Sequence, residues 1–530
     1  MTQNGDGRRA ERGGRGATAT HVPQAATARG STKRPGLLLA LVCLTQFMVI
    51  LDVSIVNVAL PSIQRGLHFG TTGLQWVVNA YTITFGGFLL LGGRAADLLG
   101  RRRMFLAGTA LFSASSLLCA FADSRGVLIG ARALQGFGGA VLSPASLSII
   151  TTSFAEGSER NRALGAWGAM AGLGDASGVL FGGILTQAFG WPAIFVINAP
   201  IGLAVITLGR GVIPESRRDD LRRDFDAPGA ILVTLGLVAV VYGIVRSDSL
   251  GWGSIAVLGS IALGIALLGA FALLEGRLAA APLLPLAVLK MRRLRAANLA
   301  MALLYAGVFS MWFFLSLFMQ GVLGYSALKA GVAFLPITLS VALASTFAPR
   351  MVARVGACRV IVAGMLSSAV GLALLSQVSA GASYLTVVLP GGVIAGAGFG
   401  MTVVPLTITA VQGVSPAQSG LASGLINTAR LVGGALGLAV LTTLADSHTA
   451  SQLTRGASRL GALASGYQLA FAVAAATCFL GSLLSLFLLR PDPSDIATVA
   501  SGREARRAAW TCGRVDAPPK PPDPMTPEPS

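Results

Sequence analysis

Long apolar segments recur along the chain and are separated by short polar or glycine-rich segments. Each apolar segment is long enough to cross about 30 Å of hydrocarbon as a helix. Backbone N–H and C=O groups find no water in lipid, so a spanning segment must bond them internally, as a helix does. The pattern predicts an all-α membrane protein. We expect fourteen spans, at residues 37–60, 74–93, 104–122, 127–151, 163–188, 192–209, 228–245, 255–274, 297–319, 330–349, 359–378, 385–411, 419–444 and 467–489.

Lysine and arginine are distributed unevenly between the two sides that these spans define. Fourteen spans place both tails on one side, and the tails and loops of that side carry 32 of the 40 basic residues. The opposite loops carry six, and the remaining two lie inside spans. Basic residues collect in cytoplasmic loops, so we expect both termini to be cytoplasmic. The net charge of +18 then follows mostly from topology, and we expect no nucleic-acid partner.

Two segments of the chain resemble each other at a constant offset. Arg94, Gly100, Arg103, Ala107 and Gly108 align, at an offset of 256 residues, with Arg350, Gly356, Arg359, Ala363 and Gly364. A second, looser match at an offset of 260 aligns residues 136–138 with 396–398. Two related halves are typical of secondary transporters, which bind substrate between them and work by alternating access. The repeat predicts a six-helix half (37–210), a cytoplasmic loop with an inserted helix pair (211–275), and a cytoplasmic loop with a second six-helix half (276–490). Composition predicts a disordered cytoplasmic tail at each end: residues 1–36 are rich in Arg, Gly, Thr and Ala, and residues 491–530 are proline-rich.

Composition argues against several other kinds of protein. Only 12% of the residues are charged, against roughly 25% in soluble globular chains. No GxxxxGK[ST] phosphate-binding loop is present, so ATP hydrolysis by that route is not expected. The five cysteines are scattered and the three histidines lie outside the apolar segments. We therefore expect no metal site, no cofactor and no enzymatic activity.

Residues 93–106 read GRAADLLGRRRMFL and join the second span to the third. Glycines in such a segment permit a tight turn and a close approach of helices, and Asp97 is able to pair with an arginine or to face a helix N-terminus. Breaking and remaking that contact would favour one transporter conformation over another. A basic cytoplasmic loop with a chance aspartate is the simpler interpretation. The predicted switch residues are Gly93, Asp97, Gly100, Arg101, Arg102 and Arg103.

This segment resembles the GxxxDxxGRRxxx loop of the major facilitator superfamily. Residues 51–61 (LDVSIVNVALP), 132–140 (RALQGFGGA) and 172–183 (GLGDASGVLFGG) resemble motifs of its fourteen-spanner drug:proton antiporters. The last motif departs from the family, because Val179 stands where a proline is usual. Its glycines are expected to pack the two halves together: Gly174, Gly178, Gly182 and Gly183.

The resemblance implies a biochemical function. It suggests export of lipophilic drugs, antibiotics or secondary metabolites across a bacterial plasma membrane, in exchange for protons and without a cofactor. The expected partners are a small lipophilic substrate, protons and the lipid bilayer, and the protein is expected to act as a monomer. Two alternatives remain open: proton-coupled uptake or symport on the same fold, and a membrane receptor or enzyme without transport.

Four charged residues fall inside the predicted spans, where a charge costs roughly 2.5–3.5 kcal/mol or more. They are Asp52, Arg132, Asp175 and Arg430. Asp52 and Arg132 are expected at similar depths in the same half. We hypothesise that Asp52 takes up and releases the proton and that Arg132 tunes its affinity, since a neighbouring cation favours the carboxylate and burial disfavours it. A static ion pair is the alternative.

Other polar residues inside the spans are candidates for contact with substrate. Asp175 could meet a cationic substrate or a second proton, and it could equally be a satisfied polar residue where the halves cross. Arg430 could neutralise a helix terminus or contact substrate. Asn57, Gln135 and Asn427 are further positions that could line a cavity.

Overall fold

The computed structural model describes residues 34–489, apart from residues 156, 217–226, 276–290 and 413–418. Within those ranges every regular element is a helix. The predicted tails lie mostly outside the described residues. The elements are α1 (Pro35–Gly66), α2 (Thr71–Leu74), α3 (Trp76–Leu99), α4 (Arg101–Ala120), α5 (Arg125–Ser153), α6 (Ser158–Phe189), α7 (Ala193–Val196), α8 (Asn198–Val212), α9 (Ala227–Leu250), α10 (Ile255–Leu273), α11 (Arg292–Leu317), η3 (Phe318–Val322), α12 (Ala327–Val355), α13 (Ala357–Leu375), η4 (Tyr384–Val388), α14 (Leu389–Val411), α15 (Ser419–Thr454) and α16 (Arg459–Leu488).

The predicted number of membrane spans is confirmed. Thirteen helices in the described ranges are long and apolar enough to cross a membrane. A further pair, Thr72–Leu89 and Leu91–Leu99, is bent by 52° and makes fourteen if it counts as one span. This bent pair corresponds to the predicted second span at residues 74–93.

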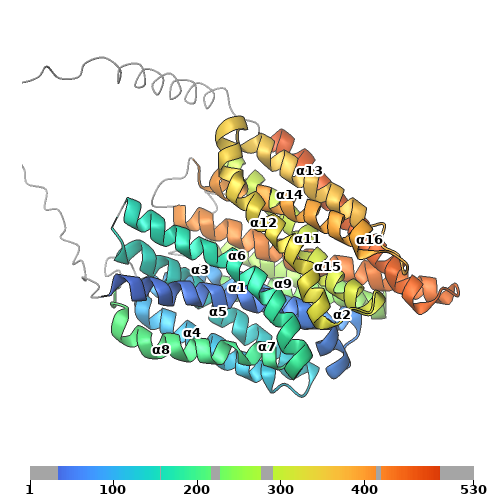
Figure 1. Cartoon of the computed structure of the whole chain (residues 1–530), viewed down its shortest axis with the longest axis horizontal. Helices are drawn as coiled ribbons and strands as arrows, with labels where there is room; N and C mark the ends of the chain where they lie inside the picture. Colours follow the sequence, from blue (N-terminus) through green and yellow to red (C-terminus); the bar gives the residue numbers. More distant parts are fainter. Residues whose placement is uncertain (1–33, 156, 217–226, 276–290, 413–418, 490–530) are drawn as a thin grey trace, which may run out of the picture. The chain divides into compact units, whose positions relative to one another are not determined.

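The helices form two six-helix groups and one hairpin. In the first group α1 packs on α6, and α5 packs on both α3 and α4. In the second group α14 packs on α12 and α13, while α16 packs on α11 and α13 (Figure 1). Helices α9 and α10 pair with each other, and α9 also packs against α3 of the first group and α15 of the second. The inserted pair therefore lies beside the α3–α15 contact.

The internal repeat is visible in the packing of paired glycines. In the first group a Cβ at Gly108 would lie 3.1 Å from the carbonyl oxygen of Gly138, where α4 crosses α5. In the second group a Cβ at Gly364 would lie 2.9 Å from the carbonyl oxygen of Gly398, where α13 crosses α14. Absence of a side chain lets each pair of backbones approach closely. The aligned glycines thus make the same helix crossing in each half.

The connections on the arginine-rich side are shorter than the sequence predicted. Residues 94–103 and 350–359 were expected to form loops, but α3 continues to Leu99 and α12 to Val355. One glycine separates each helix from the next: Gly100 has φ 109° and Gly356 has φ 89°. Only a residue without Cβ adopts these angles readily, so the turn falls at the aligned glycine in both halves. Nothing else in either segment interrupts a helix.

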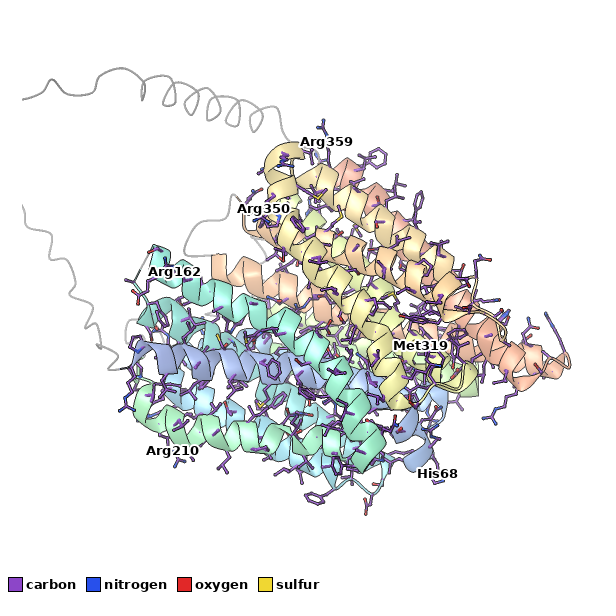
Figure 2. The ribbon with its side chains drawn as sticks, in the orientation of Figure 1. His68, Arg162, Arg210, Met319, Arg350 and Arg359 are labelled. Carbon is purple, nitrogen blue, oxygen red and sulfur yellow. The ribbon has the colours of Figure 1, made fainter. Side chains whose placement is uncertain are left out.

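Two hydrogen bonds join the halves toward one end of the helices. Figure 2 shows Arg162, Arg210, Arg350 and Arg359 at the opposite end from His68 and Met319. Toward the His68 end, Gln320 Nε2 donates to the Val58 carbonyl at 2.8 Å, and the Leu328 amide donates to Gln187 Oε1 at 3.3 Å. The halves also meet nearer mid-height, where a Cβ at Gly86 would lie 3.0 Å from Leu431 Cβ.

Candidate functional site

Asp52 is the centre of a buried polar network in the first half. Its Oδ2 accepts a hydrogen bond from Arg132 Nη1 at 2.6 Å. Its Oδ1 accepts from Gln135 Nε2 at 2.7 Å and from Asn198 Nδ2 at 2.9 Å. Asp52, Gln135 and Asn198 are fully buried, and Arg132 is 1% exposed. The network joins α1, α5 and α8, and it satisfies both carboxylate oxygens with polar donors.

Arg132 has several interactions besides the carboxylate. Its Nε donates to the Val77 carbonyl on α3 at 2.9 Å, and its Nη1 also donates to Gln135 Oε1 at 2.7 Å. The guanidinium carbon lies 4.4 Å from the centroid of the Tyr81 ring. A cation over an aromatic face is attracted by the ring quadrupole. Arg132 is therefore held in place by groups that would remain if Asp52 became neutral.

The predicted pairing of Asp52 with Arg132 is present, while the other intramembrane acid lies elsewhere. Asp175 on α6 accepts a hydrogen bond through Oδ1 from the hydroxyl of Ser54 on α1, and it is partly exposed. Asn57 donates to the Val53 carbonyl of its own helix at 3.2 Å and is 8% exposed. These two predicted residues are not bonded to Asp52, whereas the predicted Gln135 is.

Arg430 lies on α15, in the second half, together with the predicted Asn427. Both residues are partly buried. The Arg430 guanidinium carbon lies 5.6 Å from the centroid of the Tyr305 ring on α11.

The predicted switch segment is held by ion pairs at the arginine-rich end. Arg101 Nη2 lies 2.9 Å from Asp97 Oδ1. Asp97 was expected to pair with an arginine or to face a helix N-terminus, and the structure shows the arginine pair. Glu215, just beyond α8, lies 3.6 Å from Arg102 Nε and 3.7 Å from Arg103 Nε. Its Oε1 also accepts from the Arg102 amide at 3.1 Å, at the start of α4. An acid at a helix N-terminus is favourable. Gly93 packs against Pro144 on α5.

Replacing Gly100 by Ala should destabilise the protein more than replacing the equivalent Gly356. Both positions have positive φ, which costs an alanine roughly 1–2 kcal/mol. A Cβ at Gly100 would also lie 2.6 Å from Glu215 Oε1, whereas one at Gly356 meets nothing within 4 Å. Thermal unfolding of the purified variants in detergent compares the two. Adding Glu215→Ala should reduce the Gly100→Ala loss to that of Gly356→Ala, and an unchanged loss would contradict the assigned contact.

The four glycines predicted to pack the halves together do not all do so, and for three of them the prediction is wrong. Gly174, Gly178 and Gly182 face α1 within the same half. Only Gly183 meets the other half, where a Cβ would lie 2.8 Å from the Ala327 carbonyl of α12. Residues four apart share one helix face, and the next residue turns about 100° away. The three glycines spaced by four therefore belong to the α1 face, and Gly183 belongs to the α12 face.

Comparison with known proteins identifies the family. The profile described as Major Facilitator Superfamily matches residues 42–438. The chain belongs to the major facilitator superfamily. This confirms the resemblance carried by the motifs and agrees with the fold. The protein is accordingly a multi-pass membrane transporter that handles small molecules.

Curated relatives of this major facilitator transporter are bacterial resistance and export proteins. The puromycin resistance protein pur8 of Streptomyces alboniger is 39% identical over 492 residues, covering 91% of this chain and 97% of the relative. The cephamycin export protein CmcT of Amycolatopsis lactamdurans is 42% identical over 437 residues, covering 82% of this chain and 90% of the relative. The match therefore extends over most of both chains.

Solved structures support the same fold at much lower identity. The crystal structure of the POT family transporter PepTSo matches with a TM-score of 0.62 and 16% identity, covering 86% of this transporter and 98% of that chain. A nucleoside transporter NupG matches with a TM-score of 0.59 and 14% identity, covering 86% and 100%. At these identities the likeness concerns the fold alone.

Sequence reasoning missed three residues of the site in this transporter. Asn198 donates to Asp52 and also to Ser116 Oγ at 3.0 Å. It is a polar residue inside a predicted span, which is the signal that could have found it. Glu215 pairs with Arg102 and Arg103 of the predicted switch segment. Its position just after a span is the only sequence feature that distinguishes it. Tyr305 contacts Arg430, but a single tyrosine in an apolar span is not distinctive.

Proposed function

We propose that this transporter exports lipophilic antibiotics, drugs or secondary metabolites and drives the export with protons that enter in exchange. The observation that carries the proposal is the fully buried Asp52 carboxylate with Arg132, Gln135 and Asn198 around it. The likeness to a puromycin resistance protein and a cephamycin export protein supports the direction of transport and the class of substrate.

Protonation of Asp52 is the coupling step in this proposal. With the carboxylate ionised, Arg132 is paired and the ties between α1, α5 and α8 are complete. A proton on Asp52 removes one charge of the pair, and Arg132 keeps its bonds to Val77 and Gln135. Because the network is sealed from solvent in this conformation, proton entry requires another conformation. Such a requirement ties proton movement to alternating access.

The packing between α6 and α12 supports assignment of this conformation as the one open to the arginine-rich side. Near the middle and far end of α6, the Val179 carbonyl and Gly183 meet α12 closely. Toward the arginine-rich end, a Cβ at Gly165 or Gly168 would meet nothing within 4 Å. The excess of basic residues on that side supports placing it, with both termini, in the cytoplasm. Substrate would then enter from the cell interior.

No cofactor is required by this scheme, and one chain contains both halves. The proton gradient supplies the driving force, and the substrate site would lie between the halves of a single polypeptide. We therefore propose a transporter that functions as a monomer in the bacterial plasma membrane, with substrate, protons and lipid as its partners.

Inverted membrane vesicles from an efflux-deficient host test the direction of transport. The vesicles are energised to an acidic interior and supplied with puromycin, a cephamycin and a panel of lipophilic dyes. Export by the cell corresponds to accumulation inside these vesicles. We expect the transporter to accumulate at least one compound in a manner that collapse of the pH gradient abolishes. Accumulation only in right-side-out vesicles would instead establish proton-coupled uptake.

A further inference from the structure

Arg430 carries a positive charge in the transmembrane region without a carboxylate partner. Among the residues that the structure describes, it forms no ion pair, and its buried Nε has no hydrogen-bond partner. Arg132 is different, since its guanidinium meets Asp52, Gln135 and the Val77 carbonyl. A cation held in a membrane protein without an anion is costly. An acceptor from outside the chain would relieve that cost.

Aromatic rings accompany the unpaired arginine. Tyr305 lies under the guanidinium, with its ring centroid 5.1 Å from that of Phe399 and 6.4 Å from that of Phe309. All three rings are partly exposed, whereas Phe313 and Phe314 one turn further along α11 are buried. Partly exposed rings beside a cation offer both stacking and charge complementarity. The surroundings suit a flat, unsaturated molecule with an acidic group.

We propose that Arg430 and Tyr305 form a substrate site selective for aromatic or polycyclic compounds that carry a carboxylate or another anionic oxygen. The anionic oxygen accepts from Arg430, whose buried Nε has no partner, and the ring system packs on Tyr305. This inference rests on the proposed function and adds the charge of the preferred substrate. It differs from the cationic substrate that Asp175 was considered able to meet.

The charge of the substrate also affects the energetics of exchange with protons. Export of an anion in exchange for an inward proton moves positive charge inward on both legs, so the membrane potential assists the cycle.

Dye binding to the purified full-length protein in lipid nanodiscs tests the site. Fluorescein and rhodamine 123 share a xanthene ring system, and at neutral pH the first is anionic and the second cationic. Fluorescence anisotropy should show tighter binding of fluorescein. Arg430→Gln should weaken that binding by about 10- to 100-fold, as expected for loss of a charged hydrogen bond. Arg430→Lys should retain more of it.

Arg350 supplies the matched control. Its guanidinium also lies 5.6 Å from an aromatic centroid, that of Phe347, but it is exposed at the arginine-rich end of α12. Arg350→Gln removes the same charge and the same type of ring contact, and it should leave fluorescein binding unchanged. Thermal unfolding of each variant identifies any that fails to fold. Arg430→Lys, which preserves the charge and most of the side chain, then serves as the test.

Two results would overturn the inference. One is equal affinity of the wild-type protein for both dyes, including binding of neither. The other is a fluorescein preference that survives Arg430→Gln. Failure of the proposed function has a different signature, because vesicles with an acidic interior would then accumulate no compound even if fluorescein bound selectively. Conversely, proton-driven accumulation of a compound together with either of the two overturning results would preserve export and reject this site.

Discussion

Replacing Asp52 by Asn should abolish proton-driven drug accumulation in inverted vesicles, with the initial rate falling to that of vesicles without the transporter. Asparagine fills the same space and still accepts a hydrogen bond, but it carries no titratable proton. Its amide also leaves the Arg132 charge without a partner carboxylate. Since Arg132 keeps its contacts with Val77, Gln135 and Tyr81, we expect the variant to insert and fold.

Two further variants make this result interpretable. Asp52→Glu keeps a carboxylate and should keep measurable transport, reduced because the longer side chain disturbs the bonds from Gln135 and Asn198. Asp123→Asn removes the carboxylate of an exposed residue between α4 and α5, and it should behave as wild type. Retained proton-driven transport in Asp52→Asn would reject Asp52 as the coupling residue and favour a static ion pair.

Replacing Arg132 by Met should lower the free energy of unfolding by about 3–5 kcal/mol, because it leaves the Asp52 carboxylate buried without its cation. Both side chains of the pair are at most 2% exposed, so solvent cannot compensate for the lost partner. Unfolding in mixed detergent micelles, followed by tryptophan fluorescence, measures the change. Surface pairs such as Arg103 with Glu215 should contribute only about 0–1 kcal/mol by the same assay.

A double-mutant cycle separates the ion pair from the loss of side-chain packing. Asp52→Asn combined with Arg132→Met leaves no net charge at the site, and the double variant should recover about half or more of the stability lost in Arg132→Met. Coupling energies of about 0.5–3 kcal/mol are usual for residues in one polar network. Additive losses in the two single variants would mean that the carboxylate and the guanidinium do not depend on each other in the folded state.

The sequence was sufficient to predict the membrane fold because hydrocarbon imposes a simple requirement on the backbone. Apolar length determines the number of spans, and the motif residues near Asp97 identify the family. The pairing of Asp52 with Arg132 was also predictable. Charges inside spans are rare, and the two residues are expected at similar depth in one half. Their contact at 2.6 Å confirms the pairing, while the proton-coupling role stays a prediction.

The neighbour that each helix face packs against and the residues at which helices end were not predictable in the same way. Gly174, Gly178 and Gly182 were assigned to the wrong neighbour, because a glycine face identifies close packing without naming the helix that packs on it. Asn198 was missed since neutral amides inside spans are less distinctive than charges. The segment 94–103 was predicted as a loop because its charge suggested exposure. Helix α3 nevertheless continues to Leu99, and Gly100 is the one residue of the segment that separates it from α4.

Proton movement through the purified protein tests the central claim most directly. The transporter is reconstituted in liposomes with an acidic interior and a pH-sensitive dye, and an accumulated compound from the vesicle screen is added outside. The account predicts that substrate addition collapses the pH gradient in wild-type liposomes and has no effect with Asp52→Asn. Accumulation of the compound while the wild-type gradient stays intact would contradict proton-coupled export and require another source of energy.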